Sequence, residues 1–578
     1  MVFMDCKILE QVEKQIQVVI DYPLSEEIMR RLNEKFCVRD VGYGTYVVTL
    51  SETDTEELAE YLLKYPYIPK CYFLQQEDRI QAPILPQNSI SVLEETGILK
   101  IQSSPLSLRG NGVIMGFLDT GIRYDLPCFL DASGKSRILA IWDQTINGLP
   151  PNGFNYGSLY TKEMIDEALL SDNPREIVPS YDIDGHGTKC ASVACGSDNI
   201  ADGNLGVAPE CDIVMVKLRQ TPYFLREYYQ IPKDLICYSE PDILQALAFL
   251  QSFTKPFERP LITSVFFGTN MGNHSGDSIL SGYINQMGAA RNQVVVVAAG
   301  NEGNEGSHYH GEVILNKENH YVDIELLIGE GENGFVMELW GKKPDTFTIG
   351  LTSPAGEVIP EISYRVGRSF GYDLVYSQTQ ITVSYVVVEQ GTGEELILIR
   401  METPKAGLWT IRVFAKGEAG IGVFDLWLPS KQLLRGDTRF LRPDSGTTIT
   451  APAYGKVPIT VAAYDNNNNG YYINGGRGYA SDGGIKPDLM APGVNINTVL
   501  GKESGTSIAA AFLAGACADF MQWAVVEKND IFVNTLSMKN YLIRGARRDR
   551  DLEYPSPILG YGKLDMRGVF DQIAGVNK

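Results

Sequence analysis

The chain has 578 residues, 44% of them hydrophobic, so it is long enough for several domains with large buried cores. Its formal net charge of −21 is the opposite of the basic balance that phosphate binding requires, which argues against a nucleic-acid partner. No run of about 18 apolar residues occurs, so no membrane span is expected, and the charged N-terminus predicts a protein made intracellularly without a signal peptide.

The first 87 residues are expected to form a unit of their own. Strand-like and helical patterns alternate there, with strands at 15–22, 44–50 and 70–75 and helices at 24–36 and 52–65. This β-α-β-α-β order is typical of a ferredoxin-like α+β unit with one further strand unread. A Pro-rich connector at 80–89 follows it.

Residues 88–307 and 441–578 are expected to form one α/β domain. Apolar strands lie between helical segments, at 112–119, 211–218, 260–268, 293–300 and 458–464. Strands that are apolar almost throughout indicate a parallel sheet covered by helices on both faces. In open sheets of this kind the functional side chains lie at the carboxyl ends of the strands.

Residues 308–440 differ in pattern from the stretches on either side. Short alternating strands are divided there by Gly, Pro and charged turns, and no convincing helix appears. The pattern predicts an all-β insertion, either a two-sheet sandwich or a jelly roll, within the α/β domain.

Three short motifs carry the chemistry. Asp119 ends an apolar strand in the sequence FLDTGI, His186 lies in DGHGT, and Ser507 follows GT at the start of a small-residue helix. A serine hydroxyl needs a base to remove its proton, and an imidazole titrates in the right range. A carboxylate then fixes the imidazole tautomer and stabilises the imidazolium. We therefore predict a catalytic triad of Asp119, His186 and Ser507.

The same chemistry requires donors for a developing oxyanion. The main-chain N–H of Ser507, at a helix start, supplies one, and the side-chain amide of Asn301 supplies the other. Among known triads, the order Asp, His, Ser along the chain is that of subtilisin.

Five motifs in order carry a family resemblance: DTGI, DGHGTKCA, AAGNEG, KPDLMAPG and GTSIAAA all resemble subtilase motifs. The β-rich block between Asn301 and Ser507, and the stretch VKLRQTPYFLREYYQIP, resemble the clostridial germination-specific Csp proteases. The resemblance implies a subtilisin-like three-layer α/β fold, a chaperone-like inhibitory prodomain at 1–87 and a jelly-roll insertion. Because all three triad residues are present, the chain resembles the active members and not the pseudoproteases.

The resemblance also implies a function. Such proteases activate the precursor of a cortex-lytic hydrolase when spores germinate, which would place the protein in the spore. The implied partners are a protein substrate, the chain's own prodomain bound in the cleft, and related pseudoprotease subunits. Two alternatives remain open: a sensing or binding protein with little turnover beyond self-cleavage, and a general degradative intracellular subtilase.

Self-cleavage is expected between Gln87 and Asn88, because subtilase mature chains usually begin a few tens of residues before the catalytic Asp. The resemblance assigns Phe266, Phe267 and Gly268, with Ala299 and Gly300, to substrate binding. Two aromatic residues in that strand are a departure from the family pattern. They either narrow the first specificity pocket or simply fill the core.

Several other patterns compete with the triad as functional sites. Asp119 and Asp444 both begin aspartic-protease-like triplets, but that interpretation leaves His186 and Ser507 unexplained. His308 and His310 lack the further ligands that a metal site needs, and 465–470 lacks the closing Glu of a calcium loop. The nine scattered cysteines predict free thiols. No cofactor or metal is expected.

Overall fold

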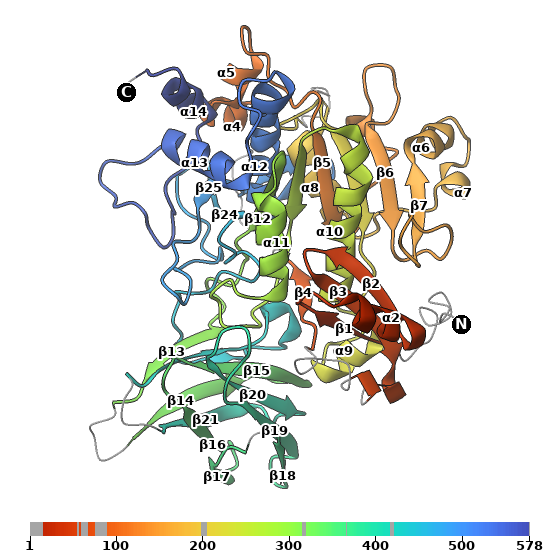
Figure 1. Cartoon of the computed structure of the whole chain (residues 1–578). Helices are drawn as coiled ribbons and strands as arrows, with labels where there is room; N and C mark the ends of the chain where they lie inside the picture. Colours follow the sequence, from red (N-terminus) through yellow and green to blue (C-terminus); the bar gives the residue numbers. More distant parts are fainter. Residues whose placement is uncertain are drawn as a thin grey trace.

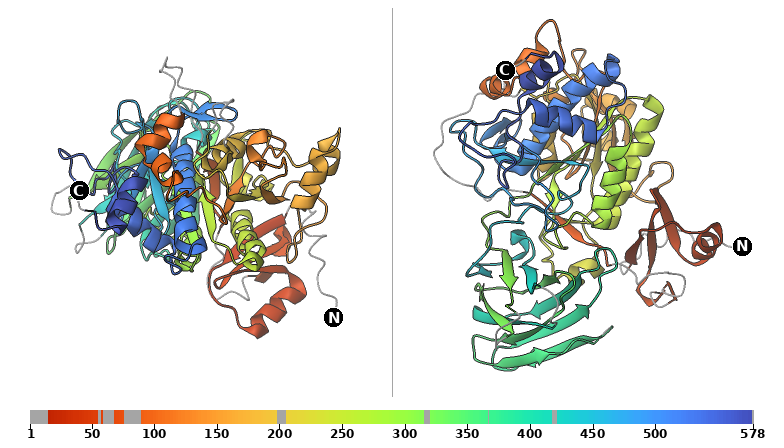
Figure 2. Two further views of the ribbon diagram at one scale, coloured as in Figure 1. Left: turned by 90° about the horizontal axis from the view of Figure 1, so that it is seen from above. Right: turned by 60° about the vertical axis from the view of Figure 1, so that its left-hand side comes forward.

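The computed structural model describes residues 15–54, 57–58, 68–75, 89–197, 205–314, 320–365, 367–416 and 421–576. They form three units: an N-terminal unit within 15–58, an α/β unit, and an inserted β-unit at 308–440. In Figure 1 and in the right-hand view of Figure 2, the α/β unit lies above the other two. The inserted β-unit lies below it and the N-terminal unit to one side.

An eight-stranded sheet forms the centre of the α/β unit, in the order β25-β24-β12-β10-β5-β8-β6-β7. All neighbouring strands are parallel except the edge pair β6 and β7. The strands are β5 (Ile114–Asp119), β6 (Ile138–Asp143), β7 (Ser158–Thr161), β8 (Asp212–Lys217), β10 (Leu261–Val265), β12 (Gln293–Ala298), β24 (Ile459–Tyr464) and β25 (Leu489–Pro492). The predicted α/β fold with a largely parallel sheet is confirmed.

Helices cover both faces of this sheet. Helices α8 (His186–Cys195) and α12 (Thr506–Met521) share one apolar core, while α10 (Glu240–Thr254) and α11 (Ile279–Ala289) share the other. Figure 1 shows α10 and α11 side by side in front of the sheet. The remaining helices are α4 (Ser89–Glu95), α5 (Ile98–Gln102), α6 (Lys162–Leu169), α7 (Pro174–Ile177), α9 (Tyr223–Tyr228), α13 (Thr535–Gly545) and α14 (Met566–Ile573).

Helix α12 runs through the centre of the α/β unit, and each of its residues is buried. With the turn that follows, 506–526 is apolar enough by length and composition to span a membrane, yet 89% of the relevant window is covered by the rest of the protein. An apolar helix of this kind is what a large core requires.

The N-terminal unit contains a three-stranded antiparallel sheet in the order β1-β3-β2. Its elements are β1 (Gln15–Ile20), α2 (Glu26–Lys35), β2 (Cys37–Gly42) and β3 (Thr45–Ser51). Ser25 caps α2 by accepting a hydrogen bond from the N–H of Ile28 at 3.3 Å. One face of the N-terminal sheet packs on the α/β unit, where Val19, Val41 and Val47 join the apolar core that contains residues of α10 and α11.

Strand β4 (Cys71–Leu74) corrects the predicted layout of this unit. The sequence pattern predicts that it completes the N-terminal sheet, but it instead pairs with β9 (Cys237–Ser239) and β11 (Phe267–Gly268) of the α/β unit. Hydrophobic pattern alone predicts a strand but not its partner, which tertiary pairing decides. Residues 71–74 are therefore built into the α/β unit as the central strand of a three-stranded sheet.

The inserted β-unit consists of two antiparallel sheets around one core. Their orders are β13-β22-β15-β20-β19-β18 and β17-β16-β21-β14-β23. Burial alternates along strands such as β20, as expected for sheets with one solvated face. The strands are β13 (His308–Glu312), β14 (Tyr321–Ile328), β15 (Gly334–Gly341), β16 (Phe347–Thr352), β17 (Val358–Ile362), β18 (Ser369–Leu374), β19 (Thr379–Val386), β20 (Glu395–Glu402), β21 (Gly407–Ala415), β22 (Val423–Trp427) and β23 (Arg439–Phe440). A short hairpin, β26 (Ile496–Thr498) and β27 (Gly501–Glu503), precedes α12.

Seven buried cysteines, at 71, 128, 190, 195, 211, 237 and 517, are free thiols. Cys37 is disulfide-bonded, so the expectation that all nine cysteines are free is wrong for this residue. Sequence spacing does not reveal which of several cysteines a fold brings together.

Close packing between α12 and its surroundings leads to a stability prediction for Gly515. A Cβ at this position would lie 2.6 Å from the carbonyl oxygen of Ala194 and 2.5 Å from Cβ of Val207. Gly515→Ala should therefore destabilise the protein by about 1–3 kcal/mol, despite the better helix propensity of alanine. Urea unfolding measures the change.

Gly282 in α11 is the matched control, because a Cβ added there would meet no atom within 4 Å. Gly282→Ala should stabilise the protein by about 0.5–1 kcal/mol. If Gly515→Ala proved as stabilising as Gly282→Ala, the close approach of α8 and α12 would be wrong.

Candidate active site

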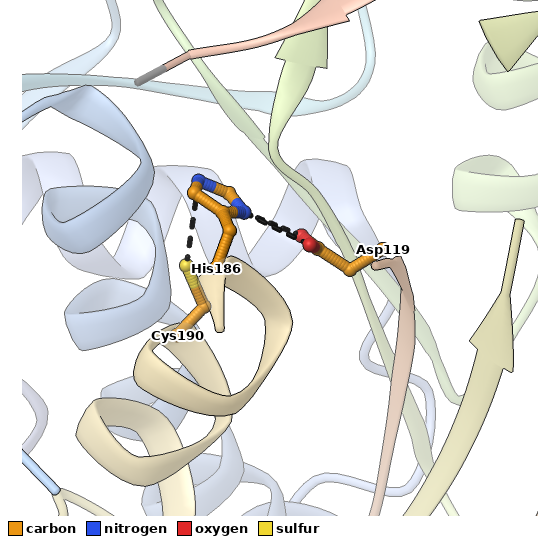
Figure 3. Close-up of side chains that lie close together, drawn as sticks. All are labelled: Asp119, His186 and Cys190. Carbon is orange, nitrogen blue, oxygen red and sulfur yellow. Dashed lines mark hydrogen bonds and ion pairs between the residues drawn. The ribbon is translucent and has the colours of Figure 1, made fainter. Parts of the chain in front are cut away.

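Asp119 and His186 are brought together from a strand end and a helix start. Asp119 is the last residue of β5, and His186 is the first residue of α8. The His186 Nδ1 lies 2.9 and 3.0 Å from the two carboxylate oxygens of Asp119 (Figure 3). Asp119 Oδ1 also accepts a hydrogen bond from the N–H of Thr120 at 2.7 Å, which fixes the carboxylate.

The pairing determines which nitrogen of His186 can act as a base. Burial by itself lowers the pKa of His186, but the charge of Asp119 raises it, and the net pKa lies well above the usual value. Because Nδ1 donates to the carboxylate, Nε2 is the nitrogen that can accept a further proton. A base held in this way is strong, and it becomes available as the pH rises through its raised pKa.

Cys190 lies one helical turn after His186 on α8, with its Sγ 3.9 Å from Nε2 (Figure 3). Within the described ranges, Asp119, His186 and Cys190 form the one group of three or more metal-ligating side chains whose atoms come within 4.8 Å of one another. Burial raises the pKa of the Cys190 thiol, whereas metal binding uses the thiolate. A neutral thiol beside His186 therefore suits a histidine that acts as acid and base better than it suits a metal ion.

Ser507 is the second residue of α12 and is almost completely buried. Its main-chain N–H is one of the first four in the helix, which have no acceptor within it. Its hydroxyl oxygen lies 3.2 Å from the carbonyl oxygen of Phe266 and 3.3 Å from that of Gln75, so its one proton is donated towards these carbonyls and not to His186. Phe266 thus lies between the two parts of the predicted triad, with its carbonyl at the Ser507 hydroxyl and its ring 6.4 Å from that of His186.

Asn301 completes the group and is held by Thr506. Its Oδ1 accepts hydrogen bonds from the N–H and the hydroxyl of Thr506 at 3.1 and 3.0 Å. The Thr506 hydroxyl in turn accepts from the N–H of Gly300 at 3.0 Å. This network points the Asn301 amide NH₂ group into the site, and the role of Thr506 has no sequence signal beyond its position before Ser507.

Gln75, directly after β4, occupies the centre of the site. Its carbonyl oxygen accepts a hydrogen bond from Asn301 Nδ2 at 3.0 Å and lies 3.3 Å from the Ser507 hydroxyl. Its N–H donates to the carbonyl of Phe266 at 3.2 Å. An extended segment with one carbonyl between a nucleophile and an oxyanion donor has the geometry of a bound protease substrate.

The side chain of Gln75 lies in a pocket lined by glycines. Its Oε1 accepts a hydrogen bond from the N–H of Asn301 at 2.9 Å. A Cβ at Gly268 would lie 2.8 Å from Gln75 Nε2, so the side chain needs the space that this glycine leaves. The hydroxyl of Thr450, beside Gly268 and Gly300, is buried without a hydrogen-bond partner. The pocket therefore accommodates an uncharged polar side chain.

The two aromatic residues before Gly268 lie in the core. Phe266 packs against Phe117 at 6.1 Å between ring centroids and lies edge-on to His186 at 6.4 Å. Phe267 lies on the other side and meets Tyr72 edge-to-face at 5.9 Å. Neither ring is exposed, and Phe267 contributes to the surroundings of Tyr72.

The cleft is covered on its outer side by two other parts of the protein. Cys71 and Phe73 of β4 belong to one apolar cluster. Its other members include Leu225 and Tyr229, at and just after α9, and Val336 and Leu433 of the inserted β-unit. The Gln432 side chain donates to the carbonyl of Leu74. As a result, every residue of 71–75 is at most 3% exposed.

The remaining sequence candidates lie elsewhere. Gln87 and Asn88 fall outside the described residues. His308 and His310 both lie within hydrogen-bond distance of one oxygen of Asp425, at 3.1 and 2.7 Å, within the inserted β-unit. Asp444 accepts from the N–H of Gly446 in a local turn.

The chain is similar to a known family and to a solved structure. Residues 110–376 and 387–562 match the model of the Peptidase_S8 family, described as the subtilase family. The solved structure of the CspB protease from Clostridium perfringens superimposes with a TM-score of 0.74 at 31% identity, over 84% of this chain and 97% of that one.

Two curated plant proteins from Arabidopsis thaliana are also similar. The subtilisin-like protease SBT2.1 is 32% identical over 125 residues, and SBT1.9 is 29% identical over 133 residues. These matches cover 19% and 20% of this chain, but only 15% and 17% of the plant proteins.

Glu302, next to Asn301, gives a pH-dependent stability prediction. Burial raises its pKa from 4.5 to about 7, although the N–H of Lys431 donates to it at 3.1 Å. As the pH rises above 4.5, the unfolded state ionises first, so stability falls until the pH passes about 7. Glu302→Gln should therefore stabilise the protein at pH 8 by on the order of 1–3 kcal/mol, and much less at pH 5. Urea unfolding at both pH values measures this.

The exposed residue Glu94 supplies the control. Glu94→Gln should leave stability unchanged at both pH values. A gain from Glu302→Gln that is equal at pH 5 and pH 8 would contradict the raised pKa.

Proposed function

The chain belongs to the subtilase family of serine proteases, and from this premise we propose that it is an endopeptidase that cuts its own chain after Gln75 and then processes a protein precursor. The carbonyl of Gln75, held between Asn301 and Ser507, is the observation that supports this proposal. Residues 1–75 would then be a prodomain whose carboxyl end stays in the cleft.

In the proposed reaction each site residue has one task. His186 Nε2 takes the proton of the Ser507 hydroxyl, Asp119 orients and stabilises the imidazolium, and the hydroxyl oxygen attacks the carbonyl carbon of Gln75. The negative charge that develops on the carbonyl oxygen is stabilised by Asn301 Nδ2 and the N–H of Ser507. Because the hydroxyl donates to Phe266 in the resting state, it must first rotate about the Cα–Cβ bond of Ser507 towards His186.

The remaining steps of the proposed cleavage are those of an ordinary acyl transfer. His186 returns its proton to the nitrogen of residue 76, which leaves as the new N-terminus, and water then hydrolyses the acyl bond on Ser507. The product carboxylate of Gln75 stays next to the same donors, so the cut segment competes with any other substrate.

The family resemblance and the buried position of residues 71–75 support a proposal for the substrate class. We propose a single protein precursor, a spore cortex-lytic hydrolase zymogen activated during germination, in keeping with the resemblance to Csp proteases. A general degradative role is disfavoured, because an enclosed strand site with buried subsites suits few sequences.

A second candidate function is supported by the burial of the segment. Since 71–75 are almost inaccessible, no external substrate can bind while they remain in place. The chain would then act mainly as a sensing or binding protein, without turnover beyond its one self-cleavage. Hydrolysis of an external protein by the purified, self-cut chain would rule this candidate out.

The position of the cut distinguishes the site proposed here, after Gln75, from the site after Gln87 that is expected from the sequence. We predict that the purified chain yields a large fragment beginning at residue 76, and that Ser507→Ala stays intact. Gln75→Glu places a charge in a buried pocket and should slow the cut at least about 100-fold. Intact mass, N-terminal sequencing and a time course of cleavage measure these outcomes.

Gln87→Glu is the matched variant and should be cut at the parental rate. A large fragment beginning at Asn88, with Gln87→Glu slow and Gln75→Glu unaffected, would overturn the assignment of Gln75.

A further inference from the structure

A buried carboxylate lies beneath the segment in the cleft. Glu240 is the first residue of α10, directly after β9, and it is fully buried. None of the chemistry described above uses it. A carboxylate in such a place is costly unless hydrogen-bond donors surround it.

Most of its donors come from the segment itself. Glu240 Oε2 accepts from the N–H of Lys70 at 3.2 Å, and Oε1 accepts from the hydroxyl of Tyr72 at 3.4 Å. The N–H of Leu280 in α11 supplies the third donor, at 3.2 Å. The main-chain N–H of Glu240 also donates to the carbonyl of Lys70 at 3.0 Å. Two of the three donors to the carboxylate would leave with the segment.

The protein contacts both the apolar ring of Tyr72 and its hydroxyl group. Its ring is fully buried, it lies opposite Tyr238 in the β4–β9 pair, and it meets Phe267 edge-to-face. The hydroxyl end of the side chain lies at the carboxylate, 3.4 Å from Glu240 Oε1. A phenylalanine would fill the same space but would leave the carboxylate short of a donor. Sites built to bond a hydroxyl discriminate strongly against the analogue that lacks it.

We propose that Glu240 makes the cleft selective for tyrosine at the fourth position before the scissile bond, both in the chain's own segment and in the protein substrates that replace it. The proposal rests on the proposed cut after Gln75, which defines Tyr72 as the fourth position. Together with the pocket around Gln75, it defines the substrate as an extended segment with tyrosine and glutamine three residues apart. The Lys70 main-chain contact adds affinity that does not depend on sequence.

Self-cleavage of the full-length chain tests this selectivity. The parent, Tyr72→Phe, Glu240→Leu and the double variant are made by cell-free translation, and the cut fraction is followed over time; leucine has no acceptor for the Tyr72 hydroxyl. Binding contacts away from the scissile bond contribute to the cleavage rate itself, so losing a hydrogen bond to a charged group should slow the cut about tenfold or more. Because both changes remove the same contact, the double variant should be no more than about twofold slower than the slower single variant.

Tyr46→Phe is the matched control, since it removes a hydroxyl from β3 of the N-terminal unit, away from the cleft. It should cut at the parental rate. N-terminal sequencing of each product verifies the position of the cut.

The outcomes separate the two proposals. If the parent is not cut after Gln75, the proposed function itself fails. If the parent is cut there and Tyr72→Phe keeps the parental rate, only the role of Glu240 is overturned. Single-variant effects that multiply in the double variant also overturn it, because Tyr72 and Glu240 would then act independently.

Discussion

The structure depends on one strand pairing, the insertion of β4 between β9 and β11. This pairing carries the Gln75 carbonyl to Asn301 and Ser507, and it places Tyr72 against Glu240. Main-chain hydrogen bonds hold the strand in register, and the register decides which side chains face the α/β core and which face the covering elements. A shift by one residue would exchange the two sets of side chains and move the carbonyl out of the site.

The cover over this strand links the three units. Residues near α9, Val336 in β15 and the 431–433 turn close the outer side of the cleft, while the N-terminal sheet packs on α10 and α11. The inserted β-unit therefore contributes directly to the surroundings of the bound segment. Release of the segment requires these contacts to open, which makes the covered cleft a barrier to exchange as well as a determinant of selectivity.

The sequence is most informative where a motif and a strand end coincide. Asp119, His186, Asn301 and Ser507 can be predicted because each follows a buried strand or lies at the start of a helix. The structure pairs Asp119 with His186 and places Asn301 and Ser507 at the Gln75 carbonyl. The contacts of Gln75 and Glu240, on which their proposed roles rest, cannot be predicted, because they arise from pairing between segments far apart in the chain. For the same reason the sequence pattern places β4 in the wrong sheet. The cut expected at Gln87 rests on the distance to Asp119 and stays a prediction, since Gln87 lies outside the described residues.

The most direct test of the account is the reactivity of Ser507 towards a fluorophosphonate probe, which labels activated serines that are accessible. We predict slow labelling of the purified parent protein, in which the self-cut segment stays in the cleft, and fast labelling of a Tyr72→Asp, Leu74→Asp variant, whose segment cannot bury two charges. Equal, fast labelling of both would show that the segment does not occupy the cleft. No labelling of either would show that Asp119 and His186 do not activate Ser507.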